Sequence, residues 1–216
     1  MKLYANLLSF NRKKYTQRLV EQLAEFCDRI VVVDSLSTDG IYEWLEENKD
    51  KYKIDLYQNK WEGFGEQRQF ALDKTPTGVW VLRIDNDELP AIGMKALLKE
   101  SLDNYGVPQG GQSFGVYTPL YSLTDEKHYT PDAFSAEIRT WYNTGNLRWT
   151  KGAHEILQGD IPQGILHPSI AIVQLDRMDK KMIEEKKSYY KANNIPEKDY
   201  GEVSSKPLPW EVEYDL

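Results

Sequence analysis

The sequence predicts an α/β fold, with a mostly parallel, doubly wound sheet, helices on both of its faces and an irregular, partly antiparallel second half. Strand-like and helix-like segments alternate over residues 1–105, and this order is typical of parallel sheets. The apolar run at residues 79–84 continues directly into Asp85, Asp87 and Glu88. Ligands of open parallel sheets bind beyond the carboxyl ends of the strands, so we expect an acidic site there.

The elements of the first half follow from the spacing of apolar residues. Strands are expected at residues 3–10, 29–34, 53–58 and 79–84. A helix at residues 13–27 places Tyr15, Leu19, Leu23 and Phe26 on one face. A second helix passes through Trp44 after cap candidates at residues 37–39, and a third follows the glycine elbow at residues 61–65 and extends to about residue 74.

The pattern becomes less regular after a helix expected at residues 92–102. Residues 106–111 are expected to form a loop, and residues 113–123 alternate like an exposed antiparallel strand. The segments 139–142 and 146–150 resemble a hairpin around the turn residues 143–146. A charged helix is expected at residues 178–193, and residues 196–216 read as an extended tail. We expect a single domain over residues 1–216.

Composition limits the possible functions. A net charge of −7 without a sustained basic face argues against nucleic-acid binding. The single cysteine, Cys27, allows no intrachain disulfide, so a reducing compartment and a cytoplasmic location are expected. No apolar segment is long enough for a signal peptide or a membrane span, so any membrane association is expected to be peripheral.

Several polar residues follow the strands at one edge of the expected sheet. Asp34 ends the second strand, Arg68 follows the glycine elbow, and Asp85 and Asp87 end the fourth strand. Two side chains at i and i+2 of an extended chain face the same space roughly 7 Å apart. Carboxylates around a cation, together with an arginine, are suited to a nucleoside diphosphate. The alternative is an acidic turn that caps the next helix.

Four ordered motifs resemble those of family-two glycosyltransferases with the GT-A fold. They are the second-strand segment 31–40, the segment 63–72 before the acidic strand, Asp85-Asn86-Asp87-Glu88, and the pair of segments 139–141 and 149–155. The last pair resembles the branch that builds lipopolysaccharide-core and related surface glycans. Asn86 stands where a small residue is usual and Gln69 where asparagine is common, but neither change removes a charged ligand.

The resemblance implies a transferase that moves a sugar from a nucleotide-sugar donor, expected to be a UDP-sugar, to a hydroxyl of a glycan or glycoconjugate acceptor. Residues 1–105 would bind the donor and residues 106–195 the acceptor. The expected cofactor is Mn²⁺ or Mg²⁺, held by Asp87, Asp85 and His154. The donor itself would be held by Ser9, Asn11, Asp34, Arg68 and Asp85.

Glu155 is the expected general base, because it follows the expected hairpin and matches the family's His-Glu pair. A carboxylate opposite the leaving diphosphate would take the acceptor proton, and a single displacement would invert the anomeric centre. A structural ion pair for Glu155 and a merely hydrogen-bonded His154 are the alternatives.

Two other functions are compatible with parts of the pattern. A sugar-phosphate nucleotidyltransferase would usually carry a glycine-rich, basic loop after the first strand, but residues 9–13 contain no glycine. A non-catalytic carbohydrate- or cation-binding module is the second alternative. Its EF-hand form requires a glycine soon after the acidic residues, where Leu89 and Pro90 stand instead.

Overall fold

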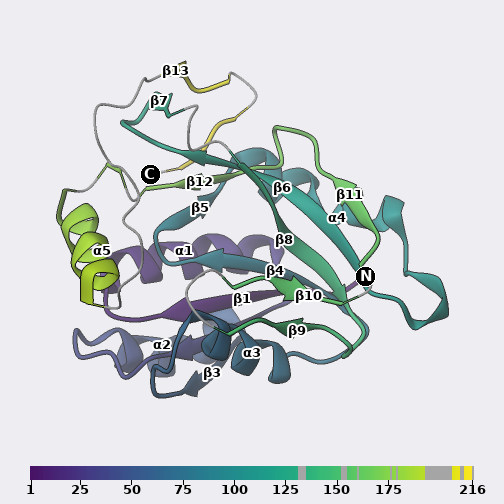
Figure 1. Ribbon diagram of the computed structural model, residues 1–216, viewed down its shortest axis with the longest axis horizontal. Coiled ribbons are helices and arrows are strands. Elements are labelled where there is room, and N and C mark those ends of the chain that lie inside the picture. Colours follow the sequence, from purple (N-terminus) through teal and green to yellow (C-terminus); the bar gives the residue numbers. More distant parts are fainter. Residues whose placement is uncertain are drawn as a thin grey trace.

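A computed structural model of the chain describes residues 1–130, 135–151, 155–159, 161–175, 177–178, 180–192, 206–209 and 212–215. Its central element is a curled, nine-stranded mixed sheet (Figure 1). The predicted α/β class is confirmed, and both the parallel first half and the partly antiparallel second half are present.

Four parallel strands form the first half of the sheet. They are β1 (Leu3–Ser9), β2 (Arg29–Asp34), β3 (Ile54–Gln58) and β4 (Val79–Asp85), in the spatial order β3-β2-β1-β4. The chain builds outward from β1 to β3 and then returns to the other side of β1 with β4. Such a reversal leaves a crevice at the carboxyl ends of the strands, where ligands of this class of sheet bind.

The second half continues the same sheet. The strand β8 (Ser135–Asn143) is antiparallel to both β4 and β6 (Phe114–Ser122). Next to β6 come β12 (Ile172–Gln174) and, at the far end, β5 (Glu88–Pro90), while β11 (Gln163–Ile165) pairs with β6 off this path. Because β5 belongs to the first half of the chain, the two halves share one interleaved sheet.

Helices cover both faces of the sheet. The helices α1 (Lys13–Phe26), α2 (Ile41–Tyr52) and α4 (Ile92–Tyr105) contribute to the larger hydrophobic cluster on one face. The helix α3 (Phe64–Asp73) packs on β1 and β2 at the other face, together with β9 (Arg148–Trp149) and β10 (Leu157–Gln158). The four expected helices of the first half are therefore present.

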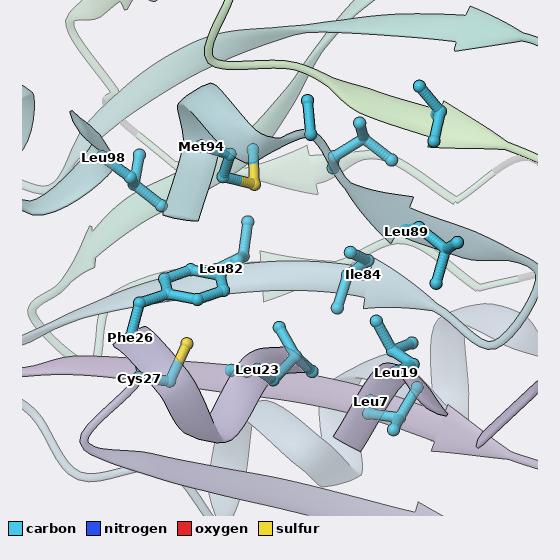
Figure 2. Packing of buried hydrophobic residues seen from close by; sticks show 14 of the residues in the cluster. Leu7, Leu19, Leu23, Phe26, Cys27, Leu82, Ile84, Leu89, Met94 and Leu98 are labelled. Carbon is cyan, nitrogen blue, oxygen red and sulfur yellow. The ribbon is translucent and has the colours of Figure 1, made fainter. Parts of the chain in front are cut away.

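Alternation along the strands builds both cores. Leu7 of β1 and Leu82 and Ile84 of β4 point into the larger cluster, where they meet Leu19 of α1 and Met94 of α4 (Figure 2). The intervening strand residues enter the smaller cluster on the opposite face, and they include Tyr4, Val31, Val79 and Val81. This two-sided burial explains why the strands read as continuous apolar runs.

The hairpin expected between residues 139–142 and 146–150 is wrong. Both edges of β8 are occupied by β4 and β6, and β9 pairs instead with β10. The side chain of Asn143 binds the carbonyl of Pro76 and the backbone N–H of Gly145, so the chain turns away from β8 at this point. Trp149 then packs against Trp141 in the smaller cluster.

The remaining elements lie at the periphery. The expected loop at residues 106–111 contains a short 3₁₀ turn, η1 (Gln109–Gly111), and the expected charged helix is α5 (Lys180–Ala192). In the region expected to be an extended tail, β13 (Lys206–Pro207) pairs with β7 (His128–Tyr129), and Asp215 forms an ion pair with Lys95 of α4. In the part of the chain that the structure describes, no helix is long and apolar enough to cross a membrane.

Candidate active site

The candidate site lies where β1, β2 and β4 end. Ser9 of β1 is in register with Asp34 of β2, and Leu8 is in register with Asp85 of β4. The strand order places these ends at the topological switch point of the sheet. Parallel pairing therefore brings together three of the residues that the sequence proposed for the donor pocket.

The loops after β1 and β2 are joined by hydrogen bonds between side chains and backbone. The carboxylate of Asp34 is fully buried and accepts the N–H of Ser37 at 2.9 Å. Ser37 Oγ in turn accepts the N–H of Asn11 at 2.7 Å, and Asn11 Oδ1 accepts the N–H of Thr38 at 2.9 Å. Asp34 and Asn11 thus order the loops at the ends of β1 and β2, while the buried Ser9 Oγ has no partner among the described residues.

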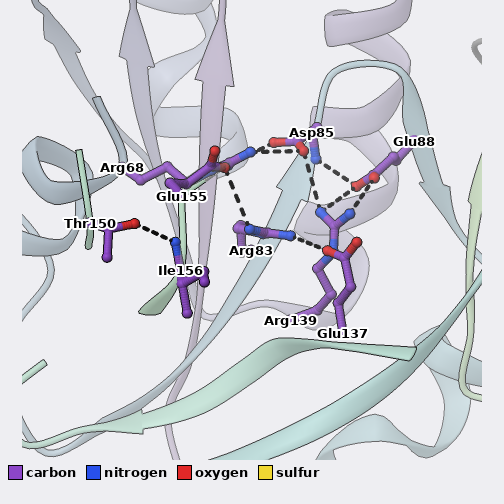
Figure 3. Close-up of polar contacts among 9 residues, drawn as sticks. All are labelled: Arg68, Arg83, Asp85, Glu88, Glu137, Arg139, Thr150, Glu155 and Ile156. Carbon is purple, nitrogen blue, oxygen red and sulfur yellow. Dashed lines mark hydrogen bonds and ion pairs between the residues drawn. The ribbon is translucent and has the colours of Figure 1, made fainter. Parts of the chain in front are cut away.

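Arg68 lies in the first turns of α3 and points at the end of β4 (Figure 3). Its Nη1 and Nη2 donate to the two oxygens of Asp85 at 2.9 and 3.0 Å, and its Nε donates to Glu155. The guanidinium is almost completely buried, with 7% of its side chain exposed. In such a planar pair with two parallel hydrogen bonds, the orientation of the guanidinium is fixed as well as the position of its charge.

A second layer of charged side chains surrounds Asp85. Arg139 of β8 donates to Glu88 at 2.9 and 3.2 Å and to Asp85 at 3.3 Å. Arg83, two residues before Asp85 on β4, donates to Glu137 at 2.7 Å. The resulting network joins β4, β5, α3, β8 and the segment before β10 (Figure 3).

Burial and charge shift the protonation of this network in opposite directions. Burial alone would disfavour ionised Asp85, but Arg68, Arg139 and Arg83 outweigh it and hold the pKa of Asp85 well below its usual value. Burial raises the pKa of Glu88 to about 7, against the opposing charge of Arg139. Burial and the neighbouring guanidinium groups lower the pKa of Arg83 to about 9.

Glu155 is brought to the site by the connection between β9 and β10. The N–H of Thr150 donates to the carbonyl of Ile156 at 2.9 Å, and the N–H of Ile156 donates to Thr150 Oγ1 at 2.7 Å. These two bonds close a loop whose last residues present Glu155 to Arg68, while Arg83 lies 3.8 Å from the same carboxylate. The expected proximity of Glu155 to the acidic edge is thus present without the expected hairpin.

Asp87 follows β4 in a turn, and its contacts differ from those of Asp85. The extended chain ends at Asp85, and residues 86–87 form a turn into β5. The side chain of Asp87 is 7% exposed and lies 3.9 Å from the guanidinium of Arg12. Because the turn breaks the alternation of the strand, the two aspartates contact different partners. His154, the third expected metal ligand, lies outside the described residues.

Residues 7–153 match the family described as glycosyl transferase family 2. The chain belongs to this family. The match includes Asp34, Arg68, Asp85 and Asp87, and ends just before the proposed His154 and Glu155.

Comparisons with a related protein and with solved structures agree with membership of family two. It is 34% identical over 167 residues to the lipopolysaccharide core biosynthesis glycosyltransferase LpsC of Rhizobium meliloti (strain 1021), across 75% of this chain and 58% of LpsC. The structure of S. aureus TarS residues 1–349 in complex with UDP-GlcNAc matches with a TM-score of 0.61 at 18% identity, across 84% of this chain and 60% of that one. The same TarS fragment in complex with UDP matches with a TM-score of 0.52 at 19% identity, across 78% of this chain and 62% of that one.

These likenesses establish the GT-A fold of the family-two chain. The chain spans less than two thirds of the length of each of these relatives.

The described residues of this family-two site could hold a divalent cation only if the phosphates of a bound substrate supply further ligands to it. Among the described residues, no group of three or more His, Cys, Asp or Glu side chains is arranged to hold a metal ion. Both oxygens of Asp85 accept hydrogen bonds from Arg68, and Asp87 is the other carboxylate of the acidic pair. Magnesium-like ions are commonly held by one or two carboxylates together with substrate phosphates. Asp87 suits that arrangement.

Sequence reasoning missed two charged members of the network. Arg83 lies two residues before Asp85 on β4, and Glu137 lies two residues before Arg139 on β8. Side chains at this spacing share a face, so a charged residue two positions before another charged residue of a strand was the available signal. In this family-two fold, a charged residue within a buried strand therefore indicates the site, just as the acidic residues at the end of the strand do.

Proposed function

We propose that this chain is a glycosyltransferase domain that moves a sugar from a UDP-sugar to a hydroxyl of a glycan acceptor, with inversion of the anomeric centre. The observation that carries the proposal is the buried Arg68 guanidinium, held between Asp85 and Glu155 at the switch point of a family-two sheet. The Arg68 guanidinium is a cation that could bind a diphosphate, and it contacts a carboxylate, Glu155, that could accept a proton.

The donor would bind across the ends of β1, β2 and β4. Asp34, Asn11 and Ser9 would line the nucleoside side, because they form the ordered rim of that edge. Arg68 would turn part of its guanidinium to the diphosphate, since charge-assisted bonds to phosphate are strong and directional. The relatives support a nucleotide-sugar, because the TarS fragment was solved with UDP-GlcNAc and with UDP.

Mn²⁺ or Mg²⁺ would be bound through Asp87, with donor phosphates and His154 as further ligands and Asp85 in the outer shell. A cation there would neutralise the charge that develops on the leaving diphosphate. Asp85 would act mainly through Arg68, because its two oxygens already accept that guanidinium. Arg12, 3.9 Å from Asp87, supplies the countercharge to this carboxylate.

Glu155 would be the general base. As Arg68 turns to the diphosphate, the Glu155 carboxylate is freed to accept the proton of the acceptor hydroxyl, and Arg83 remains 3.8 Å away. The acceptor oxygen forms a bond to the anomeric carbon while the bond to the diphosphate breaks, and the proton passes to Glu155. One such displacement inverts the configuration.

The two halves of the chain would divide the work. Residues 1–105 contain the proposed donor residues, and residues 106–195 contain Glu155 and would bind the acceptor. The name of LpsC supports an acceptor among surface glycans. We propose a cytoplasmic location with at most peripheral contact with a membrane, on the basis of the single buried Cys27 and the acidic net charge.

The decisive experiment measures nucleotide-dependent thermal stabilisation. A ligand that binds only the folded state raises the melting temperature, and the rise grows with the logarithm of the ligand concentration above its dissociation constant. We expect UDP and one UDP-sugar to stabilise the protein in the presence of Mn²⁺, and EDTA to remove the effect. Stabilisation by UTP with sugar 1-phosphate, together with release of pyrophosphate, would identify a nucleotidyltransferase instead.

A further inference from the structure

We propose that Arg139 is a positioning residue, which holds Asp85 so that Asp85 in turn directs Arg68 at the donor diphosphate. This inference rests on the proposed role of Arg68 in donor binding. Arg139 is 4% exposed, and its hydrogen bonds and ion pairs among the described residues are with the carboxylates of Asp85, Glu88 and Glu137, so it would act through Asp85 and not on the substrate.

The backbone of β8 is irregular where Arg139 stands. Thr140 pairs with Val116 of β6 and Ile138 pairs with the next residue, Tyr117, so Arg139 is an extra residue between two paired positions. Ile138 and Trp141, three residues apart, both pack in the smaller cluster, which regular alternation would not allow. A bulge of this kind re-aims a side chain, and bulges are frequent beside active sites. Here it directs Arg139 toward the end of β4.

Glu88 anchors Arg139 from the far side. It is 1% exposed, accepts both terminal nitrogens of Arg139, and also accepts the backbone N–H of Asp85 at 2.9 Å. The Glu88 carboxylate therefore fixes the backbone of Asp85, and Arg139 fixes its side chain. Loss of Arg139 would remove the countercharge of the buried Glu88 carboxylate, which is unfavourable in proteins.

The chain of contacts ends at Arg68. Asp85 Oδ2 accepts both Arg68 Nη2 at 3.0 Å and Arg139 Nη1 at 3.3 Å. A carboxylate held on one side by the Arg139 guanidinium cannot rotate freely, so it also limits the directions that the Arg68 guanidinium can take. Binding groups need this support from their neighbours to keep a productive geometry.

A double-mutant cycle tests whether Arg139 works through Arg68. Arg139→Lys keeps the charge but cannot bridge two carboxylates as a guanidinium does. We expect Arg139→Lys to weaken UDP binding at least 10-fold by calorimetry with Mn²⁺, and to change it less than 2-fold when Arg68 is already alanine. An equal loss in both backgrounds would overturn the inference. Arg29→Lys, which alters an Arg–Asp pair on β2 and β3, is the matched control.

A second measurement needs no nucleotide. In the protein alone, the Arg68 Nε–H donates to Glu155 and should give a sharp, slowly exchanging ¹⁵N-edited NMR signal. We expect Arg139→Lys, or Glu88→Gln if the first variant folds poorly, to broaden or shift this signal. An unchanged signal would overturn the positioning role. A changed signal without any UDP binding would leave positioning intact and remove the proposed donor role instead.

Discussion

Arg68 and Asp85 form a two-pronged ion pair at the floor of the site, with nitrogen–oxygen distances of 2.9 and 3.0 Å. The pair joins the start of α3 to the end of β4, two elements of the donor half of the sheet. The third nitrogen of Arg68 reaches Glu155 from the other half of the chain. One buried guanidinium therefore connects the proposed leaving-group side and the proposed base.

Replacing Arg68 should weaken nucleotide binding. We expect Arg68→Ala to raise the dissociation constant of UDP about 10-fold or more, because bonds from a guanidinium to phosphate exceed the ~0–1 kcal/mol of exposed ion pairs. Isothermal titration calorimetry with Mn²⁺ measures the change. Unaltered UDP affinity in a folded Arg68→Ala protein would exclude this residue from the donor site.

Replacing Asp87 should abolish turnover and leave the fold intact. The carboxylate lies at the sheet edge in a turn, and its loss removes the proposed cation ligand without opening the core. We expect Asp87→Ala to lose Mn²⁺-dependent stabilisation by UDP in a thermal-shift assay. Asp50→Ala, on the exposed face of α2, is the control. Full activity of Asp87→Ala, or undiminished activity in EDTA, would contradict the metal assignment.

Replacing Glu155 should slow chemistry more than binding. Glu155→Gln keeps the size of the side chain and can still accept a bond from Arg68, but it cannot take the acceptor proton. We expect kcat to fall by roughly 10²–10⁴ while UDP affinity persists. The anomeric proton of the product, observed by NMR, should show inversion with the wild-type protein. Retention, or a normal kcat in Glu155→Gln beside a Glu47→Gln control, would leave Glu155 as a structural ion pair.

Gly65 permits the close approach of α3 to the segment that carries Glu155. A methyl group on Gly65 would lie 1.9 Å from the carbonyl oxygen of Thr150. We expect Gly65→Ala to displace residues 150–151, to cost about 1–3 kcal/mol of unfolding free energy, and to reduce kcat because Glu155 loses its register with Arg68. Urea unfolding measures the first effect, with Asp73→Ala at the exposed end of α3 as control. An unchanged midpoint would show that the segment adjusts freely.

Cys27 should resist alkylation in the folded protein. Its thiol is 3% exposed, and burial raises its pKa far above the ordinary value of about 8.5. The folded state keeps the proton that the unfolded state releases, so stability from the neutral thiol is fully present below pH ~8.5 and decreases as pH rises above it. Urea unfolding of wild type and Cys27→Ala at pH 7 and pH 10 should show a smaller difference at pH 10. Rapid native alkylation at pH 8 would contradict this burial.

Much of the first half was predictable because its signals are local. The apolar run of β4 and the spacing of Leu19 and Leu23 in α1 report period two and period 3.6 within a few residues. Parallel pairing then places every strand end at one edge, so Asp34, Arg68 and Asp85 could be expected near each other. The motif resemblance added Glu155, which spacing alone did not place.

The sequence by itself determined the fold class, the edge that carries the site and the residue types gathered there. Only the tertiary structure decided that β8 inserts between β4 and β6, that Asp87 lies near Arg12 while Asp85 pairs with Arg68, and that Arg139 reaches Asp85 through a bulge. The physical reason is that periodicity records which face of an element is buried. Strand neighbours and ion-pair partners depend instead on competition among distant segments for the same edge and the same buried charge, and that competition is resolved only when the chain is folded.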